Sequence, residues 1–215
     1  MTLKIAKKII DISKKLYGLG FLTACDGNIS SLNENDNILI TPSGVAKSDL
    51  EPIDLCIVDR DGKLLSGQNP SSELYMHLEA YKRKDISAVI HAHPPLSIAW
   101  TIANTADYFV PTNCMSEVIV AIGNIPIVPY KTPGTKEMAD GIAAFVHNYK
   151  AMILSRHGTL VCGSSLDESF YGTERIENTI KILANAKSMG GLSYLQPEEI
   201  LKLWEIRKKI GEKLI

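Results

Sequence analysis

The chain has 215 residues, of which 45% are hydrophobic and 22% are charged, and its formal net charge at pH 7 is −1. This length suits one folded domain, which we expect to span residues 1–215. The balanced charge excludes the strong electrostatic attraction by which many proteins bind nucleic acid or acidic membranes, so we expect neither as a partner.

The distribution of apolar stretches and of cysteines is also typical of an ordinary globular protein. No stretch approaches the roughly 20 apolar residues that a membrane span needs, and lysines interrupt the apolar runs near residue 1, so we expect no signal peptide. The four cysteines are far apart and form no Cys-x-x-Cys pair, which is typical of a reducing compartment. We therefore expect a cytoplasmic protein.

Apolar periodicity predicts the elements of the first half in chain order. Helices are expected over residues 3–17, 71–82 and from Pro95 to about residue 102, and strands over residues 37–41, 55–59, 63–65 and 86–91. Asp61-Gly62, between two of these strands, is a strong hairpin pattern. Gly27-Asn28-Ile29-Ser30 is interpreted as a turn of small residues.

In the second half, apolar runs at residues 117–122 and 126–130 flank Gly123-Asn124 and favour another hairpin. Helices are expected over residues 136–148, 166–189 and 197–214, and strands over residues 151–154 and 159–162. Hairpins are thus mixed with crossovers, and no repeat or linker separates them. These features predict a single α/β domain with a mixed or largely antiparallel sheet and helices on both sides.

Three histidines stand out. His91 and His93 follow a buried strand, and positions i and i+2 of a strand point to the same face, so their imidazoles should project together. His157 lies in an Arg-His-Gly turn between two expected strands, where it is either a third ligand or an ordinary turn or core histidine. Three imidazoles with one open coordination position are typical of a catalytic zinc site. The other two, His77 and His147, are weaker candidates for a direct role.

Small polar residues could form an anion-binding site. Pro70-Ser71-Ser72-Glu73 has the form of a helix start with a serine cap, and its amides and hydroxyls suit a phosphate. Thr41-Pro42-Ser43-Gly44 and the turn at Gly27 let the backbone approach a ligand closely. The alternative for each segment is an ordinary turn or cap.

Taken in order, Gly27-Asn28-Ile29-Ser30, Thr41-Pro42-Ser43-Gly44, Pro70-Ser71-Ser72-Glu73, His91-Ala92-His93 and His157-Gly158 resemble the class II aldolase/epimerase family of L-fuculose-1-phosphate aldolase. The resemblance spans most of the chain. It implies a three-layer α/β fold, with a central, mostly antiparallel sheet of about nine strands between helices.

The resemblance also implies site residues, a cofactor and an assembly. His91, His93 and His157 would hold one Zn²⁺ per chain, and Glu73 would be the acid/base beside it. The substrate phosphate would be bound by Asn28, Ser43, Gly44, Ser71 and Ser72. Family members are typically homotetramers with active sites between subunits. Their chemistry breaks a carbon–carbon bond beside a carbonyl and leaves an enediolate, which a divalent metal stabilises.

Single positions help to choose among family members. The presence of Glu73, and of Leu96 where the 4-epimerases carry a further histidine, favours an aldolase over a ribulose-phosphate 4-epimerase or a methylthioribulose-phosphate dehydratase. By spacing, however, Met115 stands where the aldolases place a tyrosine, and a thioether cannot exchange a proton. Glu117 is the expected replacement, with Tyr108 as another candidate.

We therefore expect a zinc-dependent aldolase that cleaves L-fuculose 1-phosphate or a close relative into dihydroxyacetone phosphate and a short aldehyde. A dehydratase, epimerase or decarboxylase of the same family is the alternative. The adducin-like branch has lost its metal ligands and serves in assembly, so retention of the histidines and Glu73 argues against a non-catalytic domain.

Overall fold

A single mixed sheet forms the centre of the computed structural model, which describes residues 2–104, 106–211 and 213–214. Its eight strands are ordered β4-β3-β2-β1-β5-β8-β7-β6, and every neighbouring pair is antiparallel except β6 and β7. The strands are β1 (Asn28–Leu32), β2 (Ile38–Ile40), β3 (Cys56–Val58), β4 (Leu64–Ser66), β5 (Ala88–Ala92), β6 (Ile127–Val128), β7 (Ala151–Leu154) and β8 (Gly158–Gly163). The expected α/β class and mostly antiparallel sheet are confirmed, with eight strands among these residues.

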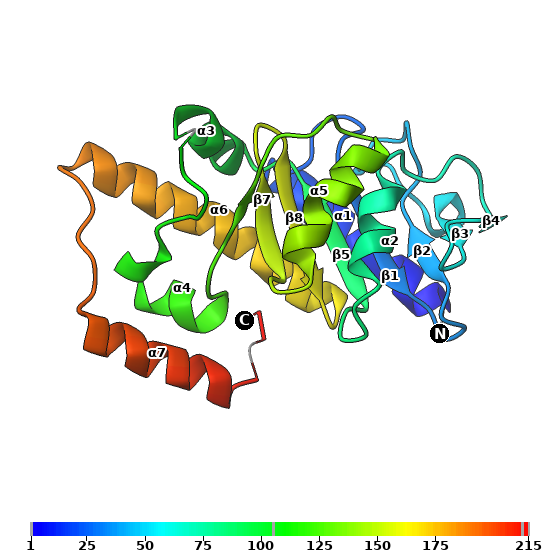
Figure 1. Ribbon diagram of the computed structural model, residues 1–215. Helices are drawn as coiled ribbons and strands as arrows, with labels where there is room; N and C mark the ends of the chain where they lie inside the picture. The colour runs from blue at the N-terminus through cyan, green and yellow to red at the C-terminus, as the bar shows by residue number, and fades with distance from the viewer. Residues whose placement is uncertain (1, 105, 212, 215) are drawn as a thin grey trace.

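Helices cover both faces of this sheet (Figure 1). The described helices are α1 (Thr2–Gly18), α2 (Leu74–Ala80), α3 (Pro95–Ala103), α4 (Ser116–Ala121), α5 (Lys136–Val146), α6 (Leu166–Ser188) and α7 (Pro197–Lys209), of which α7 packs against α4, and short 3₁₀ turns lie at Pro52–Asp54 and Thr112–Cys114. Side chains of α2 and α5 pack with the strands in one core cluster, and those of α1 and the start of α6 pack in another. A third cluster joins α3, α4 and the middle of α6.

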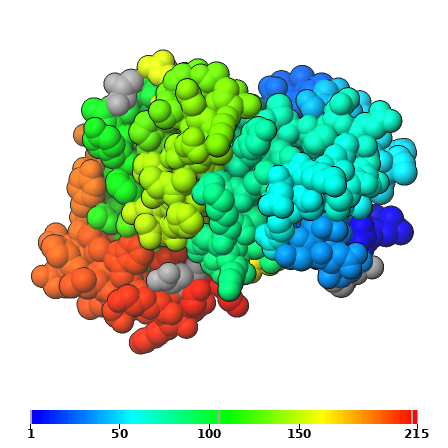
Figure 2. Space-filling model, turned by 45° about the vertical axis from the view of Figure 1, so that its right-hand side comes forward, coloured from blue at the N-terminus to red at the C-terminus, as the bar shows by residue number. Residues whose placement is uncertain are grey.

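The two ends of the chain occupy opposite sides of the molecule. Helix α1 and strands β1 to β4 (blue to cyan) lie on one side, and the C-terminal part of α6 and α7 (orange to red) lie on the other in both views, while the start of α6 packs against α1 (Figures 1 and 2). None of the described helices is long and apolar enough to cross a membrane.

The segment around Gly123 corrects the sequence prediction. Residues 117–122 were expected to form a strand of a hairpin, but Ser116–Ala121 is the helix α4. The amides of Ile122 and Gly123 both donate to the carbonyl of Val118, so Gly123, at a φ of +84°, ends a helix. A Cβ on Gly123 would lie 2.8 Å from Nε of Arg207 and 3.0 Å from the Trp204 ring. Packing against α7 therefore overrides the strand preference of the apolar residues.

Other boundaries also differ from the prediction. The segment beginning at Asn28 is not a turn but the central strand β1, whose serines hide its strand pattern. Helix α2 begins at Leu74, so Ser71 and Ser72 lie in the turn before it, although Oγ of Ser71 does accept a hydrogen bond from the Glu73 amide (3.3 Å). Helix α7 ends at Lys209 and does not continue to residue 214.

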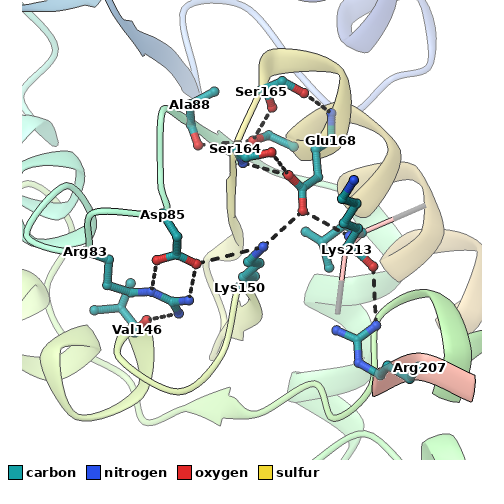
Figure 3. A network of polar contacts seen from close by, with 12 residues as sticks. Arg83, Asp85, Ala88, Val146, Lys150, Ser164, Ser165, Glu168, Arg207 and Lys213 are labelled. Carbon is teal, nitrogen blue, oxygen red and sulfur yellow. Dashed lines mark hydrogen bonds and ion pairs between the residues drawn. The ribbon is translucent and has the colours of Figure 1, made fainter. Parts of the chain in front are cut away.

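A buried carboxylate joins three distant parts of the fold (Figure 3). Glu168 is 7% exposed and accepts hydrogen bonds from the amide and hydroxyl of Ser164 (2.7 and 2.5 Å) and from the amide of Leu214 (3.0 Å). The ammonium of Lys150 lies 3.2 Å away. Burial alone would raise the pKa of Glu168, but these donors outweigh it and hold the pKa below its ordinary value. Glu168 thus ties the β8–α6 connection to the segment before β7 and to residue 214.

Replacing Glu168→Gln is expected to lower the free energy of unfolding at pH 7 by about 2–4 kcal/mol, because several donors lose a charged acceptor. Since the folded pKa lies below the unfolded one, the carboxylate stabilises fully above the unfolded pKa. The difference from wild type should therefore shrink as the pH falls below about 4.5. Urea unfolding at pH 7 and pH 4 measures both effects.

The neighbouring Asp167 is a matched control, because it is half-exposed and pairs with Lys8 at the surface. Asp167→Asn should change the stability by less than about 1 kcal/mol. Equal losses for the two variants would contradict the proposed importance of the buried carboxylate.

Candidate metal centre and active site

The end of β5 carries the first two histidines. Strand β5 lies between β1 and β8, and His91 is opposite Asn28 on one side and Leu160 on the other. His93 follows directly after the strand, and its amide donates to the carbonyl of Phe21 (2.8 Å). Nε2 of His93 lies 2.9 Å from Nε2 of His91, so the i, i+2 pair converges as its spacing predicts.

The turn between β7 and β8 supplies the third histidine. Arg156 adopts a φ of +60°, and its amide donates to the hydroxyl of Thr101 on α3 (2.8 Å), which anchors the turn. His157 follows, 9% exposed, and its ring centroid lies 4.6 Å from that of His91 and 5.1 Å from that of His93. Antiparallel pairing of β8 with β5 therefore brings together residues that are 64 to 66 positions apart in the sequence.

Glu73 closes the cluster from α2. It precedes the first residue of this helix, and its carboxylate oxygens lie 3.2 Å from Nε2 of His91 and 3.2 Å from Nε2 of His157. Oε2 also accepts a hydrogen bond from Nδ2 of Asn28 (2.8 Å). One ligand atom from each of Glu73, His91, His93 and His157 lies within 4.8 Å of all the others.

This geometry fits a divalent metal ion. Three of the separations between donor atoms, of 2.9, 3.2 and 3.2 Å, are close to the edge of a coordination tetrahedron, which is about 3.3 Å for bonds of about 2.0–2.1 Å. Nδ1 of His91 lies 2.9 Å from the carbonyl of Thr159, so the proton belongs on Nδ1 and the lone pair of Nε2 faces the cluster. Oε1 of Glu73 is buried and has no hydrogen-bond partner among the described residues. These residues can hold a metal.

Proximity and burial also shift the pKa values in the cluster. Burial alone would raise the pKa of Glu73, but His91 and His157 outweigh it and hold the pKa well below its ordinary range. Burial alone would lower the pKa of His91, but the Glu73 carboxylate raises it. Burial and the neighbouring imidazoles lower the pKa of His93 to about 3, so His93 is neutral at pH 7, as a metal ligand must be.

A cavity of about 430 Å³ opens over the cluster. Glu73, His93 and His157 line it together with every residue expected to bind phosphate: Asn28, Ser43, Gly44, Ser71 and Ser72. At its wall, Gly27 has a φ of +71°, and a Cβ there would lie 2.9 Å from the carbonyl of His91, so the turn into β1 requires glycine. Six separate parts of the sequence thus meet around one cavity: residues 25–28, 42–44, 71–73, 93, 133–134 and 157.

Comparison with known proteins identifies the family. Residues 7–184 match the family described as the class II aldolase and adducin N-terminal domain. The chain belongs to this family.

Relatives within the class II aldolase family differ in activity. The 3-oxo-tetronate 4-phosphate decarboxylase of Escherichia coli is 33% identical over 83% of this chain and 85% of its own. The 5-deoxy-D-ribulose 1-phosphate aldolase of Bacillus thuringiensis is 34% identical over 93% of each chain. A solved L-fuculose 1-phosphate aldolase is 30% identical, with a TM-score of 0.86 over 95% of this chain and 96% of its own. The resemblance inferred from the motifs is confirmed, and the protein is a lyase-type enzyme of this metal-dependent family.

The expected proton carriers after residue 107 lie apart from the cavity. Glu117 is exposed in the first turn of α4, and Tyr108 is 77% exposed. Met115 packs against the core cluster of α3, α4 and α6. None of the three lines the cavity within this chain. Asp26, which the sequence analysis did not single out, does line it, with its carboxylate 3.8 Å from Nδ1 of His93.

Lys47 was also missed by the sequence analysis. Its side chain is 1% exposed, and its ammonium donates hydrogen bonds to the carbonyls of Cys25 (2.8 Å) and Val45 (2.9 Å). Burial lowers its pKa. The residue joins the loop before Asn28 to the loop that carries Ser43 and Gly44, and these two loops form one side of the cavity. A lysine in a polar loop gives no sequence pattern that would reveal such a role.

Lys47→Met should loosen both loops, because the carbonyls of Cys25 and Val45 lose their donor while the volume of the buried side chain is nearly preserved. Amide hydrogen exchange at residues 25–27 and 43–46 is expected to become at least about tenfold faster, with β5 unchanged. The exposed Lys84 provides the control, and Lys84→Met should leave exchange in both loops at the wild-type rate. Unchanged loop protection in Lys47→Met would show that the ammonium does not hold the loops.

Proposed function

We propose that this protein is a zinc-dependent class II aldolase that reversibly cleaves a phosphorylated ketose, L-fuculose 1-phosphate or a close relative, into dihydroxyacetone phosphate and a short aldehyde. The observation that carries this proposal is the cluster of His91, His93, His157 and Glu73 at the floor of a cavity lined by small and hydroxyl-bearing residues. The expected zinc would be held by the three histidines and would supply a Lewis acid for the carbonyl oxygen of the ketose.

The phosphate group would be bound by the loops on the other side of the cavity. Ser43, Gly44, Ser71 and Ser72 provide hydroxyl and amide donors there. Asn28 gives one N–H of its side-chain amide to Glu73, and its second N–H remains for the substrate. Binding the phosphate would place the carbonyl end of the substrate toward Glu73 and the histidines.

Aldol cleavage needs two proton transfers. When the carbon–carbon bond breaks, the electron pair stays on the carbon beside the ketone, which must then gain a proton. We propose Glu73 for this transfer, and its position beside the histidines, with Oε2 3.2 Å from Nε2 of His91, supports the assignment. The hydroxyl on the other carbon must lose its proton as the aldehyde forms. We propose Glu117 for this step, contributed by a neighbouring chain of a homotetramer, since it lies outside the cavity of its own chain.

A decarboxylase is the second candidate, favoured by the 33% identity to the 3-oxo-tetronate 4-phosphate enzyme and by Met115. Loss of CO₂ from a 3-oxo acid leaves the same electron pair on the carbon beside the ketone. Only that carbon needs a proton, so no group has to accept a hydroxyl proton. Met115 at the position expected for a tyrosine is compatible with this simpler requirement.

We propose a cytoplasmic location for either activity, consistent with the four free cysteines.

Zinc binding can be tested without a substrate. The metal-stripped protein is expected to bind one Zn²⁺ per chain, and His157→Ala should weaken the affinity at least about 100-fold, because one of three protein ligands is lost. Titration calorimetry with a competing chelator measures both values. His147→Ala is the control, since His147 is exposed next to Glu79 and away from the cluster. Equal affinities for His157→Ala and wild type would contradict the assignment.

The reaction can be tested on L-fuculose 1-phosphate, 5-deoxy-D-ribulose 1-phosphate and 3-oxo-tetronate 4-phosphate. All three would release dihydroxyacetone phosphate, so an aldehyde or CO₂ must be measured beside it. Glu73→Gln should lower kcat by about 10²- to 10⁴-fold on the true substrate, and Glu79→Gln on the same helix should not. Glu117→Gln should impair an aldolase and leave a decarboxylase unaffected. No turnover of any of the three by zinc-loaded protein would contradict both candidates.

A further inference from the structure

His77 lies beneath the active site without lining its cavity. It is on α2, four residues after Glu73, and its side chain is fully buried (0% exposed). Both ring nitrogens have partners on β1: Nε2 lies 2.5 Å from Oδ1 of Asn28, and Nδ1 lies 2.6 Å from Oγ of Ser30. Oγ of Ser30 also lies 2.6 Å from the hydroxyl of Tyr81.

Chemistry fixes the direction of these hydrogen bonds, beginning at Glu73. A carboxylate only accepts, so Nδ2 of Asn28 is the donor in the 2.8 Å contact to Oε2. The carbonyl oxygen of Asn28 therefore faces His77, and Nε2 of His77 must carry the proton that is donated to it.

The other half of the chain of hydrogen bonds follows from the burial of His77. Burial and the nearby His91 lower the pKa of His77 to about 3, so the ring is neutral and Nδ1 keeps a lone pair. Ser30 then donates its hydroxyl proton to Nδ1 and accepts from Tyr81. Burial raises the pKa of Tyr81, which keeps its donor proton. The order of donation is thus Tyr81 to Ser30, Ser30 to His77, His77 to Asn28, and Asn28 to Glu73.

The backbone explains why these side chains interlock. Asn28 and Ser30 are i and i+2 on β1 and share a face of the strand. Glu73 and Tyr81 are the cap residues at the two ends of α2, and His77 lies within it; their i, i+4 and i+8 spacing puts them on one face of the helix. The chain of hydrogen bonds crosses between the two elements at every step.

We propose that His77, held as the Nε2–H tautomer by Ser30 and Tyr81, is a positioning residue that orients Glu73 through Asn28. The hydrogen bonds anchor Oε2, whereas Oε1 has no hydrogen-bond partner among the described residues and lies 3.2 Å from Nε2 of His157, on the side of the metal cluster where the substrate would bind. This inference rests on the proposed role of Glu73 in proton transfer. If His77 only filled the core, its replacement would change the free energy of unfolding and leave kcat unchanged.

Two variants of His77 separate these roles. His77→Leu fills the space without a hydrogen bond and should lower kcat about 100-fold through misplacement of Glu73, with KM changed less than about threefold and zinc content unchanged. His77→Gln keeps an N–H near the place of Nε2 and should recover at least about tenfold of that loss. A folded His77→Leu variant with wild-type kcat would overturn the proposal.

A variant of Ser30, on the side of His77 away from Glu73 in the series of hydrogen bonds, tests the same idea if His77→Leu does not fold. Ser30→Ala leaves Glu73 and Asn28 intact and should lower kcat about tenfold, since the His77 tautomer is no longer fixed. Ser169→Ala is the matched control: its hydroxyl is also buried, on α6, and donates to the carbonyl of Ala88 (3.1 Å). Ser169→Ala should keep the wild-type kcat. Equal kcat values for the two serine variants would overturn the proposal.

A measurement without turnover distinguishes this proposal from the proposed function. In zinc-loaded protein with ¹⁵N-labelled histidine, the His77 signals, identified by their loss in His77→Gln, should show a protonated Nε2 and an unprotonated Nδ1 at pH 7. A protonated Nδ1 would overturn the chain of bonds whether or not a substrate is known. If His77 has the expected tautomer but the protein turns over none of the three substrates, the proposed reaction is contradicted and the chain of hydrogen bonds is not.

Discussion

The antiparallel pairing of β5 with β1 and β8 is the constraint on which the site depends. It sets Asn28 opposite His91, and it brings the turn with His157 beside the end of β5. Side chains that leave a sheet at one edge have little freedom to move apart, because the ladder hydrogen bonds fix their origins. The ends of the central strands β5 and β8 therefore hold the three imidazoles, and only Glu73 comes from outside the sheet, at the residue before α2.

The buried polar groups of this region are connected, and each connection has a definite partner. His77 and Ser30 link the helix to the strand, Lys47 joins two loops, and the carbonyl of Thr159 sets the proton position of His91. A buried polar group without a partner is costly, so such networks fix one arrangement over its alternatives. Of the five buried side-chain atoms that have no hydrogen-bond partner among the described residues, two, Oε1 of Glu73 and Nδ1 of His157, belong to the cluster. An enzyme can use such groups on a substrate or metal.

The same site chemistry suits more than one reaction of the family. Aldol cleavage and decarboxylation both leave an electron pair on a carbon beside a ketone, and both benefit from a Lewis acid and a nearby proton carrier. They differ in whether a hydroxyl proton must also be removed. The distinction therefore depends on whether a residue outside the cluster can accept that proton, and relatives of about one-third identity include both an aldolase and a decarboxylase.

The sequence by itself determined the α/β class, most elements and the family, because apolar periodicity and the spacing of His91 and His93 are local patterns. It did not reveal β1 as a strand or α4 as a helix, since buried serines and packing against α7 override local preference. The partners of His77 and Lys47 were also invisible in the sequence. Only the tertiary structure could decide them, because each depends on segments that are distant in the chain and meet through strand pairing and helix packing.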